Sequence, residues 1–244
     1  MTNSTSASTD RPTVAAGDDA PPGSVLAAAW RPAGLIYLAV CLLGLLAGLY
    51  PEAVYPPRQP VLAAPLPALQ ALVTAQTLCI LLVHPLILLR RADRGQLGRY
   101  GPETVLESLV WLLATTPLYV AAAWLSDATA TDVLRSVVFL LCLWPLTWAA
   151  GSVLRHRRAA RPAVLIGLLA VAALPAGYYI LREFLRVFPA EWLWDLAPAT
   201  YAWQTAGART ADLLPAPAWP LAVWPALAAA IWTAAALRRP PAAP

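Results

Sequence analysis

Charge is scarce in this sequence, and lysine is missing from it altogether. Only 12% of the 244 residues are charged and all 17 basic residues are arginines, whereas an ordinary soluble domain has about 25% charged residues. Apolar residues make up 59% of the chain. This composition excludes a water-soluble domain and indicates a protein whose main solvent is lipid. The net charge of +4 does not indicate nucleic-acid binding, because the arginines gather in the loops of one side of the membrane.

Cysteine is nearly as rare as charge. The three cysteines, Cys41, Cys79 and Cys142, each lie inside an apolar run, and none belongs to a CxxC pair. Neither a disulfide framework nor a thiol redox site is therefore expected.

The motifs of membrane enzymes are also missing. The sequence has no GxS serine motif, no paired-glutamate metalloprotease motif, no HExxH helix and no aspartate-rich signature of lipid phosphotransferases. It has no Walker A loop either, so this chain cannot hydrolyse ATP by itself. A haem held by His84 and His156 is conceivable, but a histidine at a helix end more often bonds a neighbouring helix or reaches lipid headgroups. The sequence predicts no enzymatic activity and no cofactor in this chain.

What the chain does contain is six long apolar runs. A bilayer core about 30 Å thick needs about 20 apolar residues for each helical span, and the runs cover residues 32–50, 69–89, 104–125, 133–154, 163–185 and 219–237. The sequence therefore predicts an all-α, polytopic membrane protein with six transmembrane helices. Prolines inside these runs predict kinks and not ends, because neighbouring helices can satisfy the freed backbone groups. They are Pro85, Pro117, Pro145, Pro175 and Pro225.

The first 29 residues differ from the rest of the chain. They are rich in Ser, Thr, Asp, Ala and Pro, which predicts a disordered cytoplasmic tail. They lack the basic stretch directly before a hydrophobic core that marks a signal peptide. We therefore expect three parts: a tail at 1–29, a six-helix transmembrane domain at 30–239 and a short cytoplasmic tail at 240–244.

Arginine is concentrated in alternate loops. The loop after the first run has only Arg58 and the loop after the third run has none. By contrast, four arginines follow the second run and four follow the fourth: Arg90, Arg91, Arg94 and Arg99, then Arg155, Arg157, Arg158 and Arg161. Because basic residues accumulate in cytoplasmic loops, both termini are expected in the cytoplasm and the protein in the plasma (inner) membrane. The loop at 155–161 needs no role beyond topology and contact with lipid phosphates.

The charged segment between the second and third runs is longer and mixes both signs. It reads "LLRRADRGQLGRYGPETVLESL", residues 88–109, and three glycines punctuate it. Pro102 and Glu103 indicate a helix start with an acid near the positive end of the helix dipole. A docking element for a protein partner and a plain solvated loop both fit this pattern. The candidate docking residues are Arg90, Arg91, Asp93, Arg94, Arg99, Glu103 and Glu107.

Other charges lie at the edges of the apolar runs. Arg135, Arg182 and Glu183 are expected to snorkel toward an interface, as is Glu107. Glu183 and Arg186 are spaced to pair at i, i+3 on one helix face. In the first run, Gly44 and Gly48 form a GxxxG pattern, which favours close helix packing.

Residues 182–217, between the last two runs, are too polar to span a membrane and yet rich in aromatic residues. Trp192, Trp194, Tyr201 and Trp203 need an apolar bed. We therefore expect one or two short helices in the outer interface, packed against the tops of the fifth and sixth spans. Asp195 and the pair Ala197-Pro198 are expected to divide the segment into two pieces.

This layout resembles the permease subunits of ABC transporters of the type-2 exporter family. The features that match are the cytoplasmic tail, the six spans, the charged loop after the second span and the long aromatic segment before the last. The stretch "LAPATYAWQTAGAR", residues 196–209, is similar to one that the family has between its last two spans. The resemblance implies that residues 90–103 dock on a cytoplasmic ATP-binding subunit. It also implies that two permease copies, or this chain and a related one, surround a shared pathway for an exported substrate.

Two other functions stay open at this point. A non-transport membrane scaffold or assembly subunit would use the arginine loops only to set its topology, whereas a membrane enzyme is disfavoured by the missing motifs. The partners expected of a transporter are a cytoplasmic ATP-binding subunit, a second permease copy or related permease, and the lipid bilayer, with no nucleic acid.

Overall fold

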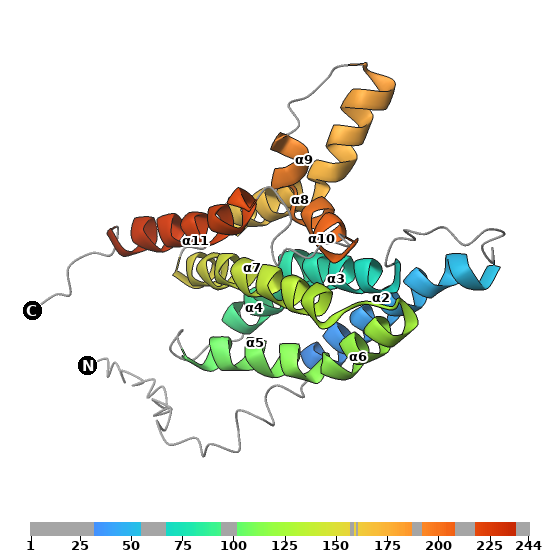
Figure 1. Cartoon of the computed structure of the whole chain (residues 1–244). Helices are drawn as coiled ribbons and strands as arrows, with labels where there is room; N and C mark the ends of the chain where they lie inside the picture. Colours follow the sequence, from blue (N-terminus) through green and yellow to red (C-terminus); the bar gives the residue numbers. More distant parts are fainter. Residues whose placement is uncertain are drawn as a thin grey trace, which may run out of the picture.

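The computed structural model describes residues 32–54, 67–93, 102–156, 159, 161–186, 192–207 and 218–237 (Figure 1). The expected tails at 1–29 and 240–244 lie outside these ranges and stay predictions. The elements in the described ranges are all helical: α2 (Pro32–Val54), α3 (Pro67–Leu78), η1 (Cys79–Val83), α4 (His84–Asp93), α5 (Pro102–Ala114), α6 (Thr116–Leu125), α7 (Ala130–His156), α8 (Arg161–Tyr179), η3 (Ile180–Phe184), α9 (Trp192–Leu196), α10 (Pro198–Gly207) and α11 (Trp219–Leu237).

The expected membrane spans coincide with helices. Five helical stretches are long and apolar enough to cross a bilayer: Pro32–Leu49, Ala68–Arg90, Val105–Leu125, Ala130–Val153 and Arg161–Phe184. A shorter apolar helix, Trp219–Ala234, lies where the sixth span is expected. The helix ends fall within four residues of the expected run ends. The prediction of an all-α polytopic membrane fold is therefore confirmed.

Two of the expected kinks coincide with breaks in α-helical hydrogen bonding. The π-helical turn η1 ends two residues before Pro85 and divides the second span into α3 and α4. Thr115 forms a turn two residues before Pro117 and divides the third span into α5 and α6. The Thr115 hydroxyl donates to the Leu112 carbonyl over 2.7 Å, which satisfies one backbone group at the break. Pro145, Pro175 and Pro225 lie inside the continuous helices α7, α8 and α11.

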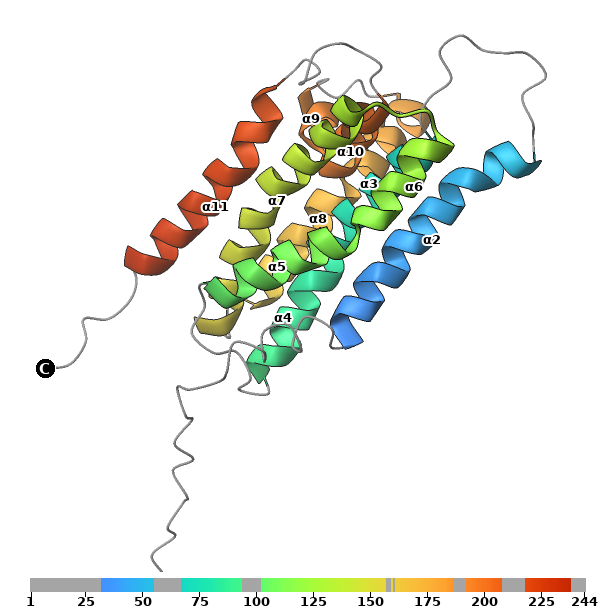
Figure 2. The same cartoon turned by 60° about the horizontal axis from the view of Figure 1, so that its bottom comes forward.

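Helices α3 and α7 form the centre of the bundle, with α2 packed along α3 and α11 packed along α7 (Figure 2). On α2 the buried side chains Tyr37, Cys41 and Leu45 recur every four residues, so they form one stripe facing the core. Figure 2 shows α9 and α10 at one end of the bundle, and the end of α4 and the beginning of α5 at the opposite end. The sequence predicts that the first of these ends faces outward and the second faces the cytoplasm.

Helix α8 is the exception to this packing. Only 6% of the span Arg161–Phe184 is buried, and Ile166 and Leu169 are 66% and 57% exposed. Figure 1 shows the C-terminal part of this helix extending away from the bundle beside α9. So apolar and so exposed a helix needs lipid or another protein against most of its surface.

Gly44 sets the distance between α2 and α3. A Cβ at this position would overlap the Cβ of Ala75 and lie 3.1 Å from the carbonyl oxygen of Ala71. A larger residue therefore cannot fit unless the two helices separate. The close helix packing expected from the GxxxG pattern is confirmed at Gly44, between two helices of the same chain.

We expect Gly44→Ala to lower the free energy of unfolding by about 1–3 kcal/mol, because the added methyl group overfills the contact with α3. Thermal unfolding of the purified protein in detergent would show this as a lower Tm. Gly167→Ala is the matched control, since no atom lies within 4 Å of a Cβ added there, and its Tm should stay the same or rise. A Gly44→Ala protein as stable as the wild type would contradict the tight packing.

Candidate functional site

The charged segment expected to dock a partner flanks two helix ends. Arg90 is exposed near the end of α4, and Arg91 and Asp93 belong to the last turn of that helix. Helix α5 begins at Pro102, as the sequence predicts, with Glu103 next in its first turn. Arg94 and Arg99 lie outside the described residues. The docking role of this segment stays a prediction.

Glu107 differs from the other candidate docking residues. It lies on α5 and is only 7% exposed, in a layer where Trp148 Nε1 donates to the neighbouring Ser108 hydroxyl over 3.0 Å. The side chain of Glu107 therefore belongs to the interior of the bundle and neither snorkels nor faces a surface open to a partner. The sequence placed it correctly near the start of the span but could not show which way it faces.

His84 is buried between two tryptophans near the same end of the bundle. Its ring meets Trp111 edge-on at 5.3 Å and Trp144 edge-on at 4.9 Å between centroids, and only 1% of the residue is exposed. Of the two roles expected for a helix-end histidine, packing against neighbouring helices is thus the observed one. Among the described residues, no three metal-ligating side chains form a group, and the side chain of His156 is not described.

A group of hydrogen-bonded polar side chains lies inside the apolar core, and we call it the polar node. Gln76 on α3 is fully buried, and its Nε2 donates to the Tyr37 hydroxyl and to the Thr115 hydroxyl, each over 3.0 Å. The Tyr119 hydroxyl donates to Gln76 Oε1. One amide therefore links α2, α3 and the break between α5 and α6. Buried polar groups in a membrane bundle need such partners, and they mark candidate functional positions.

The second buried polar group lies at the predicted outer end, around Arg135. This residue is fully buried and does not snorkel as expected. Its Nη1 lies 3.3 Å from Asp132 Oδ1 and donates to the Thr205 carbonyl over 3.5 Å. Thr205 is in the last turn of α10, where a positive charge complements the helix dipole. Arg135 thus connects α7 to the end of α10.

Asp132 is itself held by the start of α7. Its Oδ2 accepts hydrogen bonds from the Thr129 backbone N–H and hydroxyl, each over 2.8 Å. Thr129 and Asp132 bond each other reciprocally, since the Asp132 N–H donates to the Thr129 hydroxyl over 3.3 Å. This is the capping-box arrangement that begins many helices. These hydrogen bonds therefore hold the Asp132 carboxylate in the position from which it pairs with Arg135.

The aromatic segment forms the two short helices expected from the sequence, α9 and α10, which are separated at Ala197 directly before Pro198. Helix α10 contacts α8, the fifth span, as expected, but its main packing partners are α3 and α7, which the sequence did not indicate. The ring of Tyr201 lies 5.4 Å from that of Phe139 on α7, and burial raises the pKa of the Tyr201 hydroxyl. Gln70 Nε2 on α3 donates to the Trp203 carbonyl over 3.1 Å.

Only two of the four aromatic residues expected to pack on apolar neighbours do so. Tyr201 is buried and Trp194 packs against Tyr178 of α8, with 5.0 Å between ring centroids. Trp192 and Trp203 are 54% and 46% exposed, so the chain itself does not cover them. Exposed tryptophans at the level of an interface are typical of residues that face lipid headgroups.

The expected pair of Glu183 and Arg186 is not the one that forms. The π-helical turn η3 ends the fifth span at Phe184, and Arg186 lies beyond it with a φ of 53°. The i, i+3 geometry of an α-helix therefore does not apply here. Glu183 instead lies against Arg182, with 3.9 Å between Oε1 and Nε.

Sequence reasoning did not identify the polar node. Its members come from three different spans, and each one alone is an ordinary polar residue in an apolar run. A signal was present in Gln76, an amide that hydrocarbon does not solvate and that therefore requires a partner. No family model, no curated protein and no solved structure matches this chain.

Proposed function

We propose that this chain is the transmembrane permease subunit of an ATP-driven, ABC-type exporter, powered by a separate cytoplasmic ATP-binding subunit. The observation that carries the proposal is helix α10, which packs on α3 and α7 at one end of the bundle, with the short helix α9 packed between α10 and α8. At the opposite end lie the end of α4 and the beginning of α5 (Figure 2), the two helices that the charged segment at 90–103 joins in the sequence. A transporter of this kind needs one element that receives the movement of the ATP-binding subunit on the cytoplasmic side. It needs another element that closes the pathway on the outer side.

Helix α3 provides a physical connection between these two ends. It continues through η1 into α4, which ends in the charged segment, and it carries both Gln76 of the polar node and Gln70, the hydrogen-bond donor to α10. A partner that moves α4 would therefore shift the polar node and the support of α10 together. Packed helices transmit such displacements because their interfaces are not continuously deformable.

The exposed surface of α8 supports a second permease copy, or a related permease, as a further partner. A pathway between two copies agrees with the burial of the polar node, whose members are at most 4% exposed within one copy.

Site-specific photocrosslinking tests the proposal. A photoreactive amino acid at Gln96 in the charged segment should capture a cytoplasmic protein that contains an ATP-binding site, identified by mass spectrometry in the cells from which the chain comes. The same amino acid at Ala128, in the loop between α6 and α7 at the predicted outer end, is the control and should capture no such protein. Capture of membrane proteins without any ATP-binding subunit would favour the scaffold function instead.

A further inference from the structure

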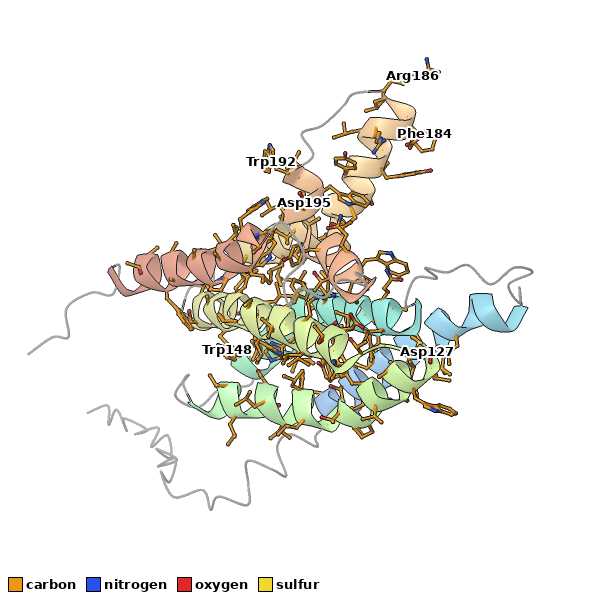
Figure 3. All side chains as sticks on the ribbon, in the orientation of Figure 1. Asp127, Trp148, Phe184, Arg186, Trp192 and Asp195 are labelled. Atoms are coloured by element: carbon orange, nitrogen blue, oxygen red, sulfur yellow. The ribbon has the colours of Figure 1, made fainter. Side chains whose placement is uncertain are left out.

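Two cavities adjoin on α8, and they have opposite chemical character. The first, of about 320 Å³, lies where η3 meets α9 and is lined by Tyr178, Tyr179, Arg182, Glu183, Trp194 and Asp195. The second, of about 210 Å³, is lined by apolar residues: Ala170, Ala173, Leu174, Gly177, Tyr178, Leu181 and Leu193. Tyr178 lines both, so the two cavities lie next to each other on either side of this residue. Figure 3 shows Asp195 and Trp192 on α9 beside the projecting end of the fifth span, which carries Phe184.

The first cavity, which we call the head cavity, has the groups that recognise an ammonium ion. Tyr178 and Trp194 lie 5.0 Å apart with their ring planes at 52°, so they form two walls of an aromatic corner. Glu183 and Asp195 add two carboxylates, and Glu183 also lies against Arg182, with 3.9 Å between Oε1 and Nε. Aromatic faces and carboxylates together bind quaternary and primary ammonium groups. Arg182 supplies a guanidinium that suits a phosphate beside the ammonium.

The second cavity, which we call the chain groove, has an apolar lining that suits an acyl chain. Its residues recur along one face of α8 from Ala170 to Leu181, a distance of about 16 Å at the α-helical rise. That is about half of a hydrocarbon core of about 30 Å, or one leaflet. Gly177 contributes to the width of the groove, because a Cβ added there would meet no atom within 4 Å.

We propose that this surface binds one phospholipid with an ammonium-bearing, zwitterionic headgroup. The ammonium lies in the head cavity against the aromatic corner of Tyr178 and Trp194 and beside the two carboxylates, the phosphate lies at Arg182, and an acyl chain lies in the chain groove. The head cavity, at about 320 Å³, is at the small end of ligand sites, which suits a headgroup and not a whole lipid. The site does not depend on the proposed transport activity.

Binding of lipids to the purified full chain, measured by native mass spectrometry, tests the headgroup. The wild type should bind phosphatidylethanolamine at least tenfold more tightly than phosphatidylglycerol with the same acyl chains, because only the first carries an ammonium. Asp195→Asn combined with Glu183→Gln should remove this preference. Asp127→Asn is the matched control: Asp127 is an exposed acid at the same end of the bundle, it lines neither cavity, and asparagine tolerates its φ of 49°. Equal affinities in the wild type, or a preference kept by the double variant, would overturn the proposal.

A second pair of variants tests the chain groove. Gly177→Leu fills the groove and should lower the affinity for both lipids at least tenfold. Gly167→Leu lies on the same helix, has equally open space around its added Cβ and lines neither cavity, so it should bind lipid as the wild type does. Phosphoethanolamine without acyl chains separates a lipid from a free amine. If it binds as tightly as the lipid, or if Gly177→Leu leaves binding unchanged, no acyl chain occupies the groove and the lipid assignment is wrong.

Discussion

Replacement of Arg135 by leucine is expected to lower the free energy of unfolding by about 3–5 kcal/mol, the largest effect of a single substitution in this chain. The Asp132 carboxylate is only 4% exposed, and without its cation it remains as an uncompensated buried charge. The Thr205 carbonyl at the end of α10 loses a donor in the same step. Thermal unfolding in detergent should show the loss, and amide exchange should become faster across residues 198–207.

Two control variants separate the effect of leaving a buried charge unpaired from the effect of losing an arginine side chain. Arg90→Leu removes an exposed arginine and should change stability by less than about 1 kcal/mol. Asp132→Asn combined with Arg135→Leu removes both charges and should recover part of the stability lost by Arg135→Leu alone. If Arg135→Leu were as stable as the wild type, Arg135 would not be the connection between α7 and α10.

Reversal of two charges in the predicted docking segment is expected to act on a partner and not on folding. Arg94→Glu with Arg99→Glu should leave membrane insertion and Tm almost unchanged, since ion pairs on a surface contribute under about 1 kcal/mol each. At an interface, loss of a desolvated charge pair costs about 2–5 kcal/mol and lowers affinity at least tenfold. Co-purification of the ATP-binding subunit and ligand-stimulated ATP turnover are the two measurements.

The loop at 155–161 provides the comparison. Arg157→Glu with Arg158→Glu reverses the same number of charges in a loop expected to have only a topological role, so the ATP-binding subunit should still co-purify with this variant. If the variant at 94 and 99 also keeps its partner and its turnover, the docking role is wrong. Those arginines would then serve only to hold the loop in the cytoplasm.

The helical spans could be predicted from the sequence because hydropathy is summed over about 20 residues, so single errors average out. The division between α9 and α10 could be predicted for a local reason: a residue before proline avoids the α-helical region, and Ala197 precedes Pro198. Both properties depend on residues near one another in the chain. Neither requires knowledge of which helices become neighbours.

The errors concern contacts between residues distant in the sequence. Arg135 is predicted to snorkel because it lies near the start of its span, and it is buried because α10 folds back beside α7, 70 residues later in the chain. The main packing partners of α10 were missed because the sequence shows which spans flank this helix in the chain, and not that it packs chiefly on α3 and α7. The polar node depends on three spans in the same way.

The π-helical turn η1 has a consequence for the rotational phase of the second span. In a regular α-helix each residue turns by about 100°, so Gln76 and His84, eight residues apart, would point about 80° away from each other. A π turn absorbs one extra residue and brings this difference back to about 20°. Gln76 therefore faces the polar node while His84, on nearly the same side, faces Trp111 and Trp144. The extra residue adjusts the two halves of the span to one another, so that Gln76 in the first half and His84 in the second both stay out of the lipid.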